Sequence, residues 1–375
     1  MIVYLIVLPT LLLHTAFAGC RVNLSLFALN LHASPLTVGI ILSLLAILPM
    51  AFAVRAGRII DRIGVRKPML LGTVTVIGGL AIAVAFPRVE ALFAVSAIVG
   101  AGFMLFHIAV NHAAGVIGRP EDRVRNFSMI ALTFSTSGFL GPMITGFAID
   151  WIGYRGTFML LTGSALAALA VLLAKPHDIP LQHHVEAHGR KKRLTDLLRT
   201  PTMRRIFVVS GALSMSWDLF SFVVPIHGSR IGLSASQIGL LLGAFGIAVF
   251  VVRLALPLVA DRLTEWQMLI FATMVTGVGF FVFPLVHTVP VLILFSFILG
   301  AGFGGAQPMI MSLLYTHAPP GRAGEAVAVR TLLINCSQAG MPLLFGALGA
   351  ALGMTPVFWA MAVVLAGSGW LMRKA

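Results

Sequence analysis

The chain has 375 residues, of which 59% are hydrophobic and only 10% are charged, and its formal net charge at pH 7 is +14. A soluble domain contains about 45–50% apolar residues, so this composition excludes an ordinary soluble protein and indicates an integral membrane protein. Because the basic residues lie mainly between apolar segments, the positive charge does not indicate a nucleic-acid-binding surface.

Apolar runs of about 20 residues recur along almost the whole chain, and a helix of that length crosses a hydrocarbon core of ~30 Å. The runs lack the strict alternation of barrel strands, so each is predicted to be a helix. The first run has no basic n-region and is too long for a signal peptide, so it is interpreted as a spanning helix. We therefore expect an all-α integral membrane fold with twelve transmembrane helices, near residues 2–29, 36–55, 69–86, 89–116, 127–149, 156–174, 205–227, 236–258, 267–285, 289–315, 327–349 and 355–371.

Basic residues gather on one side of this predicted topology. When the connections are assigned alternately to the two sides, 22 of the 26 basic residues fall on one of them, including Arg253 and Arg330 near the ends of predicted helices. The positive-inside rule then places both termini and the central loop in the cytoplasm. The compact loops favour a multi-pass protein of the bacterial plasma (inner) membrane.

One polar segment, residues 175–204, separates six predicted helices from six. It contains three prolines, four histidines, of which three lie within residues 182–188, and a run of four basic residues. The histidines could bind a metal, but a solvated linker beside anionic lipid is favoured. The expected domains are an N-terminal six-helix bundle at 1–174, a cytoplasmic linker at 175–204 and a C-terminal bundle at 205–375.

The two halves are related in sequence at a constant offset of 200 residues. Residues 98–103 match residues 298–303, and the matched single positions are Asp61 with Asp261, Arg62 with Arg262, Pro142 with Pro342 and Gly146 with Gly346. Matches that share one offset and one position in the topology indicate an internal duplication. Two bundles of equal orientation are typical of transporters in which the halves rock around a central site.

Residues 57–67, between the second and third predicted helices, resemble the cytoplasmic signature loop of the major facilitator superfamily. Glycine permits close helix approach and a tight turn, and an aspartate beside basic residues can make polar contacts that exist in only one conformation. A loop that only sets topology would not explain this spacing. The resemblance predicts a conformational gate made of Gly57, Asp61, Arg62, Gly64, Arg66 and Lys67, with Asp261 and Arg262 as its second-half counterpart.

Residues 138–146 in the fifth predicted helix resemble the family's glycine-and-proline motif, which is associated with proton-antiporting exporters. The motif residues are Gly138, Gly141, Pro142 and Gly146, while Thr145 stands in place of a glycine. Small residues and a proline allow tight packing and a bend, and ordinary small-residue packing is the alternative. The family's arginine in the fourth helix is missing, and Arg21 in the first helix occupies a position where many members have arginine.

The resemblance implies that the first, fourth, seventh and tenth helices line a central cavity. Polar side chains on these helices are therefore candidates for the substrate site, and two residues of the eleventh helix share one face at i, i+3 spacing. The substrate-cavity candidates are His14, Asn23, Asn111, Trp217, Gln307, Asn335 and Gln338.

Asp218 lies in the middle of the apolar run 206–226. A charge at bilayer depth costs roughly 2.5–3.5 kcal/mol on insertion scales, so such a residue is a functional candidate. Burial favours the protonated form of a carboxyl group and a nearby cation favours the ionised form, so Asp218, with Arg21 and His107, is a candidate for proton coupling. The alternatives are a structural ion pair between Asp218 and Arg21, an interhelical hydrogen bond, an Arg21 that holds an anionic substrate, and a His107 that only packs.

These features predict a secondary transporter that works by alternating access and exports small organic compounds in exchange for protons. The alternative is a proton-coupled uptake symporter for an organic anion or metabolite. An enzyme or a receptor is disfavoured, because no metal-ligand, phosphate-binding or nucleophile motif is present. The expected partners are a small-molecule substrate, protons and the lipid bilayer, with no cofactor, no metal and no nucleic acid, and the protein is expected to be a monomer.

Overall fold

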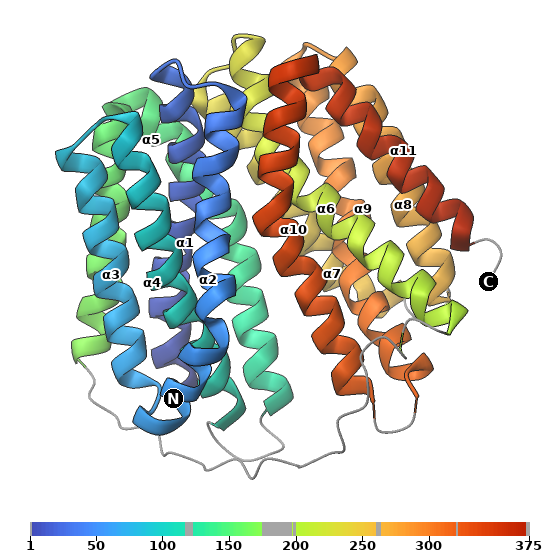
Figure 1. Cartoon of the computed structure of the whole chain (residues 1–375), viewed down its shortest axis with the longest axis horizontal. Coiled ribbons are helices and arrows are strands. Elements are labelled where there is room, and N and C mark those ends of the chain that lie inside the picture. The colour runs from blue at the N-terminus through green and yellow to red at the C-terminus, as the bar shows by residue number, and fades with distance from the viewer. Residues whose placement is uncertain are drawn as a thin grey trace. The chain divides into compact units, whose positions relative to one another are not determined.

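The computed structural model describes residues 2–116, 123–174, 197, 200–259, 264–319 and 322–372, and within these ranges the chain is almost entirely helical and contains no strand. Eleven of the described helices are long and apolar enough to cross a membrane. The helices, labelled in Figure 1, are α1 (Ile2–Asn30), α2 (Pro35–Ile63), α3 (Arg66–Ala85), α4 (Val89–Val116), α5 (Arg123–Ala174), α6 (Pro201–Arg230), α7 (Ala235–Val259), α8 (Glu265–Val282), α9 (Val289–His317), α10 (Ala323–Leu352) and α11 (Met354–Met372), with a short 3-10 helix at Phe283–Leu285.

The fifth and sixth predicted helices both lie within the single element α5. This element has 52 residues, and its backbone leaves the helical region at Gly153, where φ is 70° and ψ is 175°. A positive φ of this kind favours glycine, which has no Cβ. The break separates two spans that correspond to the predicted helices at 127–149 and 156–174, so the predicted twelve-helix fold is confirmed.

The described residues form two compact units. Unit 1 comprises residues of Met1–Glu186 and Gly228–Gly243, and unit 2 comprises residues of Ala187–His227 and Ala244–Ala375. The beginning of α7 belongs to unit 1 because it packs closely on α5. The bundle limits at 174 and 205 stay a prediction.

The internal duplication is visible in the backbone. Positive φ occurs at His32 and Gly232, and again at Gly153 and Gly353. Each pair is separated by 200 residues, the offset found in the sequence. The breaks between successive helices therefore recur at equivalent positions of the two halves.

Helix packing repeats at the same offset. A Cβ atom on Gly100 of α4 would collide with the carbonyl oxygen of Leu45, and one on Gly300 of α9 would collide with the carbonyl oxygen of Phe245. In both halves a glycine therefore lets two backbones touch, as small residues do in membrane helices. This equivalence supports the duplication at the level of individual contacts.

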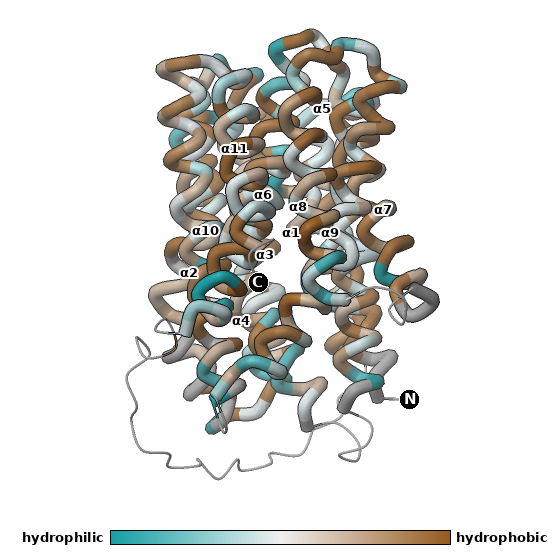
Figure 2. Tube along the Cα trace, turned by 90° about the vertical axis from the view of Figure 1, so that its right-hand side faces the viewer, coloured by the Kyte–Doolittle hydropathy of each residue, from teal (hydrophilic) through white to brown (hydrophobic). Residues whose placement is uncertain are grey.

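The outer surfaces of the helices carry large apolar side chains. Leu254, Phe271 and Val363 are each more than three-fifths exposed, and hydrophobic segments run along most helices in Figure 2. Soluble monomers rarely expose large apolar surfaces. The helices are therefore suited to contact lipid along their length.

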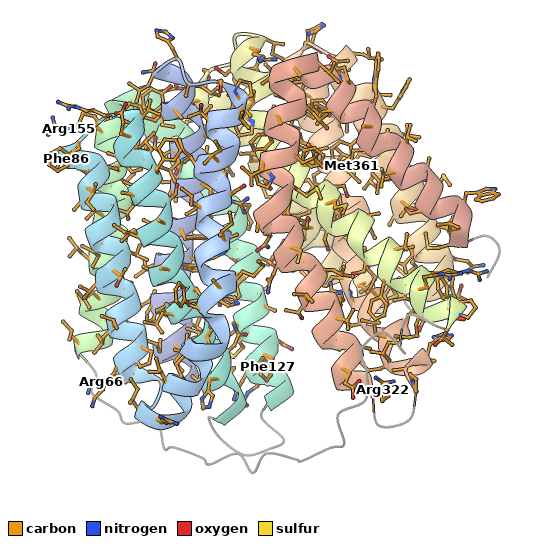
Figure 3. All side chains as sticks on the ribbon, viewed as in Figure 1. Arg66, Phe86, Phe127, Arg155, Arg322 and Met361 are labelled. Atoms are coloured by element: carbon orange, nitrogen blue, oxygen red, sulfur yellow. The ribbon has the colours of Figure 1, made fainter. Side chains whose placement is uncertain are left out.

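Polar side chains tie the ends of some helices to their neighbours. Arg155, at the start of the second part of α5, donates from Nε to the carbonyl oxygen of Val84 at 2.9 Å. Figure 3 labels Arg155 beside Phe86 at one end of α3, with Arg66 at the other end. In unit 2 the indole of Trp359 donates to the carbonyl oxygen of Phe281 at 3.1 Å. These bonds satisfy last-turn carbonyls that have no partner within their own helix.

Candidate substrate and proton sites

In unit 1, two histidines from different helices share one aromatic cluster. His14 comes from α1 and His107 from α4. The His14 ring centroid lies 5.3 Å from that of Phe103 and 4.8 Å from that of Phe134, and the corresponding distances for His107 are 5.7 and 4.9 Å. Arg21 is close enough to interact electrostatically with His14. The structure thus brings together three residues that the sequence nominated separately.

Hydrogen bonding orients the His14 ring. Its Nδ1 lies 2.5 Å from the hydroxyl of Ser137 on α5, and that hydroxyl also lies 2.8 Å from the carbonyl oxygen of Thr133. A hydroxyl can donate one proton and accept others, so Ser137 can serve either tautomer of His14.

His107 presents a polar atom that lacks a partner. Its Nδ1 is buried and makes no hydrogen bond with any residue that the structure describes. Asn111, one turn further along α4, donates to the carbonyl oxygen of His107 at 2.9 Å. A buried ring nitrogen without a partner is costly, and it can bind a substrate group, a water molecule or a proton.

Asn23 makes a contact that explains its burial. It is fully buried in α1 and donates to the carbonyl oxygen of Tyr154 at 3.1 Å, directly after the break at Gly153. The bond ties α1 to the junction between the two parts of α5. Asn23 therefore has a structural contact, and its place in a cavity stays a prediction.

In unit 2, Asp218 is 3% exposed and accepts a hydrogen bond from the hydroxyl of Ser337 at 2.7 Å. The bond links α6 to α10. Next to Asp218, the half-buried Trp217 lies edge-on to Phe303, with 5.8 Å between ring centroids. A carboxyl group at this depth in a membrane protein is costly to ionise and is therefore a functional candidate.

The contacts around Asp218 have counterparts in unit 1 at the offset of 200 residues. The Trp217–Phe303 contact is equivalent to the stacked pair Phe17–Phe103, whose centroids are 3.9 Å apart. Ser337 is likewise equivalent to Ser137, and each serine bonds an ionisable side chain of the neighbouring helix. The two serines escaped our sequence reasoning, although the offset of 200 would have singled them out.

Two arginines lie inside helices of unit 2. Arg253 on α7 donates to the side-chain oxygen of Gln307 at 2.9 Å. Arg330 on α10 is 8% exposed and donates to the hydroxyl of Ser210 at 3.2 Å. The sequence interpretation used both arginines only as signals of topology. Of the remaining candidates on α10, Asn335 is half-buried and Gln338 is exposed.

The signature loop is described in part. Gly64 ends α2 with a φ of 79°, and its N–H donates to the carbonyl oxygen of Ile60, so the predicted tight turn is present. Arg62 and Lys67 are exposed and Arg66 is half-buried. The surroundings of Gly57 and the side chain of Asp61 are not among the described features, and Asp261 and Arg262 lie outside the described residues. The predicted gate contacts therefore stay a prediction.

The glycines of the fifth-helix motif serve different neighbours. A Cβ atom on Gly141 would lie 2.8 Å from the carbonyl oxygen of Thr15 on α1, whereas one on Gly146 would collide with the carbonyl oxygen of Ala235 on α7. Gly138 has open space around it. The non-glycine Thr145 fits because its hydroxyl fills the space beside Gly19 of α1. The departure from the motif is thus matched by a glycine on the facing helix.

The first turn of α7 is capped by a carboxylate from another helix. Asp150 on α5 accepts bonds from the N–H of Ala235 at 3.2 Å and of Ser236 at 2.8 Å, and also from the Ser236 hydroxyl. One turn further along α7, a Cβ atom on Gly239 would lie 2.7 Å from the carbonyl oxygen of Pro142. The positive end of a helix dipole stabilises an anion placed there.

We expect Asp150→Ala to lower the melting temperature of the purified protein, because loss of a helix cap costs about 0.5–2 kcal/mol. Asp150→Asn keeps one acceptor oxygen and should give a smaller decrease. The melting curves can be recorded by intrinsic tryptophan fluorescence in detergent. Equal melting temperatures for the wild type and the alanine variant would show that the cap contributes nothing to stability.

Comparison with known proteins assigns the chain to a protein family. The family model of the Major Facilitator Superfamily matches residues 6–339 and 206–374. The chain belongs to this family, whose members are transporters rather than enzymes, and it is a multi-pass membrane transporter.

Relatives of this chain include resistance proteins. It is similar to the multidrug resistance protein MdtG of Serratia proteamaculans, with 25% identity over 64% of this chain and 61% of the relative. It is also similar to the class G tetracycline resistance protein of Vibrio anguillarum, with 26% identity over 84% of this chain and 80% of the relative.

Solved structures share the fold. A POT family transporter superposes with a TM-score of 0.82 at 16% identity, covering 99% of this chain and 95% of that one. A D-xylose-proton symporter superposes with a TM-score of 0.79 at 15% identity, covering 100% and 97%. At these identities the likeness concerns the fold alone.

Proposed function

We propose that this protein exports small organic compounds in exchange for protons, by alternating access. The observation that carries this proposal is the buried carboxyl group of Asp218, which is bonded to Ser337 in the middle of apolar helices. The similarity to multidrug and tetracycline resistance proteins supports export.

The chemistry of Asp218 suits a proton carrier. In a dry environment an ionised carboxyl group is costly, and hydrogen-bond donors such as the Ser337 hydroxyl offset part of that cost. Contact with water lowers the cost and releases the proton. A conformational change that alternately exposes Asp218 to the two sides of the membrane would therefore move one proton in each cycle.

Uptake of an organic anion with protons is the second candidate. Arg330, buried without an acidic partner among the described residues, favours it because a guanidinium group binds carboxylates well.

We further propose that both termini lie in the cytoplasm, because the basic residues cluster on one side of the predicted topology. We also propose that the protein works as a monomer in the bacterial inner membrane.

Transport into everted membrane vesicles tests the proposal. Vesicles containing the protein should accumulate at least one member of a panel of dyes, antibiotics and organic acids when a proton gradient is imposed. Vesicles from cells without the protein are the control. Movement of one organic acid only, and only in right-side-out vesicles, would favour uptake instead.

We expect Asp61→Asn to slow turnover with little change in substrate affinity, because a gate residue acts on the conformational step. Transport rates at increasing substrate concentration separate the two effects. A large loss of affinity in Asp61→Asn would instead place this residue in the binding site.

A further inference from the structure

Arg330 is a buried cation whose described neighbours are all neutral. Its side chain is 8% exposed, its Nε donates to the Ser210 hydroxyl at 3.2 Å, and one terminal nitrogen lies 3.7 Å from the sulfur of Met311. No carboxylate among the described residues pairs with it. Burying a charge without a counter-ion costs on the order of several kcal/mol, so a bound anion would stabilise Arg330.

A second guanidinium group lies nearby on the same face of α9. Arg253 of α7 bonds to Gln307, while Arg330 of α10 contacts Met311. Gln307 and Met311 are four residues apart in one helix, so their side chains are neighbours. The two arginines therefore flank one strip of α9, one from α7 and the other from α10.

The members of this cluster differ in exposure. Gln307 is exposed and Arg253 is half-buried, whereas Arg330 and Ser210 are buried. The cluster thus offers two cations, an amide and a hydroxyl within unit 2. Guanidinium groups form paired hydrogen bonds with planar or tetrahedral oxyanions.

We infer that Arg330, Arg253, Gln307 and Ser210 bind the oxyanion group of the transported compound, a carboxylate, sulfonate or phosphate on an amphipathic molecule. The inference rests on the proposed transport of small organic compounds and specifies their class. The headgroup of an anionic lipid has the same chemistry, so the test must separate the two sources.

Binding to the purified protein in phosphatidylcholine nanodiscs provides the test. The probes are charged and neutral partners of equal shape: salicylate with salicylamide, and naphthalene-2-sulfonate with naphthalene-2-sulfonamide. At least one anion should bind more tightly than its neutral partner. Arg330→Met and Arg253→Met should each weaken that anion about ten-fold or more, the loss expected for one charged hydrogen bond.

Arg322→Gln is the matched control, because Arg322 lies at the start of the same helix and already pairs with Glu325 at 2.5 Å. It should leave anion binding unchanged. The melting temperature of ligand-free Arg330→Met should be equal to or higher than that of the wild type, since no described carboxylate pairs with Arg330 and an apolar side chain of similar size carries no desolvation cost. A merely structural arginine would instead give a lower melting temperature and unchanged anion preference.

Several results would overturn the inference. Equal binding of charged and neutral partners in both pairs would do so, as would anion binding that survives both methionine variants. If phosphatidylglycerol nanodiscs alone stabilise the wild type, and Arg330→Met removes the effect, the site belongs to lipid. Binding is measured without transport, so the two proposals can fail separately. If the protein binds anions but exports nothing, only the proposed function is contradicted.

Discussion

Asp218→Asn is expected to abolish proton-driven transport while substrate exchange across the membrane continues. Asparagine keeps the size of the side chain and an oxygen that can accept the bond from Ser337, but it cannot take up or release a proton. The conformational change itself needs no titration. The variant should therefore resemble an uncoupled carrier, in which a substrate gradient still drives exchange.

Proteoliposomes allow both modes to be measured on one preparation. Accumulation under an imposed proton gradient should fall to the level of empty liposomes in Asp218→Asn, and counterflow of labelled substrate should remain. Ser337→Ala is the matched control, because it removes the hydrogen bond but leaves the carboxyl group in place. It should keep proton-driven accumulation at a reduced rate. Equal loss of both modes in a folded Asp218→Asn protein would contradict the coupling role.

Gly300→Ala is expected to destabilise unit 2 strongly, although it adds only one methyl group. The added Cβ atom would collide with the Phe245 carbonyl oxygen and lie 2.8 Å from its carbonyl carbon. Backbone atoms cannot rotate away as a side chain can, so α7 and α9 must separate. Overpacking of this kind costs about 1–3 kcal/mol, which should lower the melting temperature and the yield of monodisperse protein.

Gly340→Ala is the comparison variant, because a Cβ atom there would have no neighbour within 4 Å. Alanine in place of a helical glycine stabilises by roughly 0.5–1 kcal/mol where space allows, so this variant should melt at or above the wild-type temperature. Gly100→Ala should repeat the loss in unit 1, at the equivalent contact with Leu45. Equal melting of Gly300→Ala and Gly340→Ala would refute the packing argument.

Much of the fold could be predicted because hydropathy reports directly on membrane helices. Eleven described helices and the break at Gly153 account for the twelve predicted segments. The duplication could also be detected in the sequence, because contact with a neighbouring backbone requires glycine at positions such as Gly100 and Gly300. Such positions keep their residue type in both halves.

The side-chain partners could not be predicted, because they join residues far apart in the chain. Nothing near Asp218 in the sequence indicates that it bonds to Ser337. Arg330 looked like one more basic residue at a helix end, and its burial depends on how α6, α9 and α10 pack around it. His14 and His107 are 93 positions apart, yet both rings pack against Phe103 and Phe134.

The equivalent serines of the two halves contact ionisable partners of different kinds. The Ser137 hydroxyl lies against the ring nitrogen of His14, whereas the Ser337 hydroxyl donates to the carboxyl group of Asp218. Because a hydroxyl can both donate and accept, the same residue type serves a base in the first half and an acid in the second. The duplicated position could therefore keep its serine while the ionisable residue facing it changed.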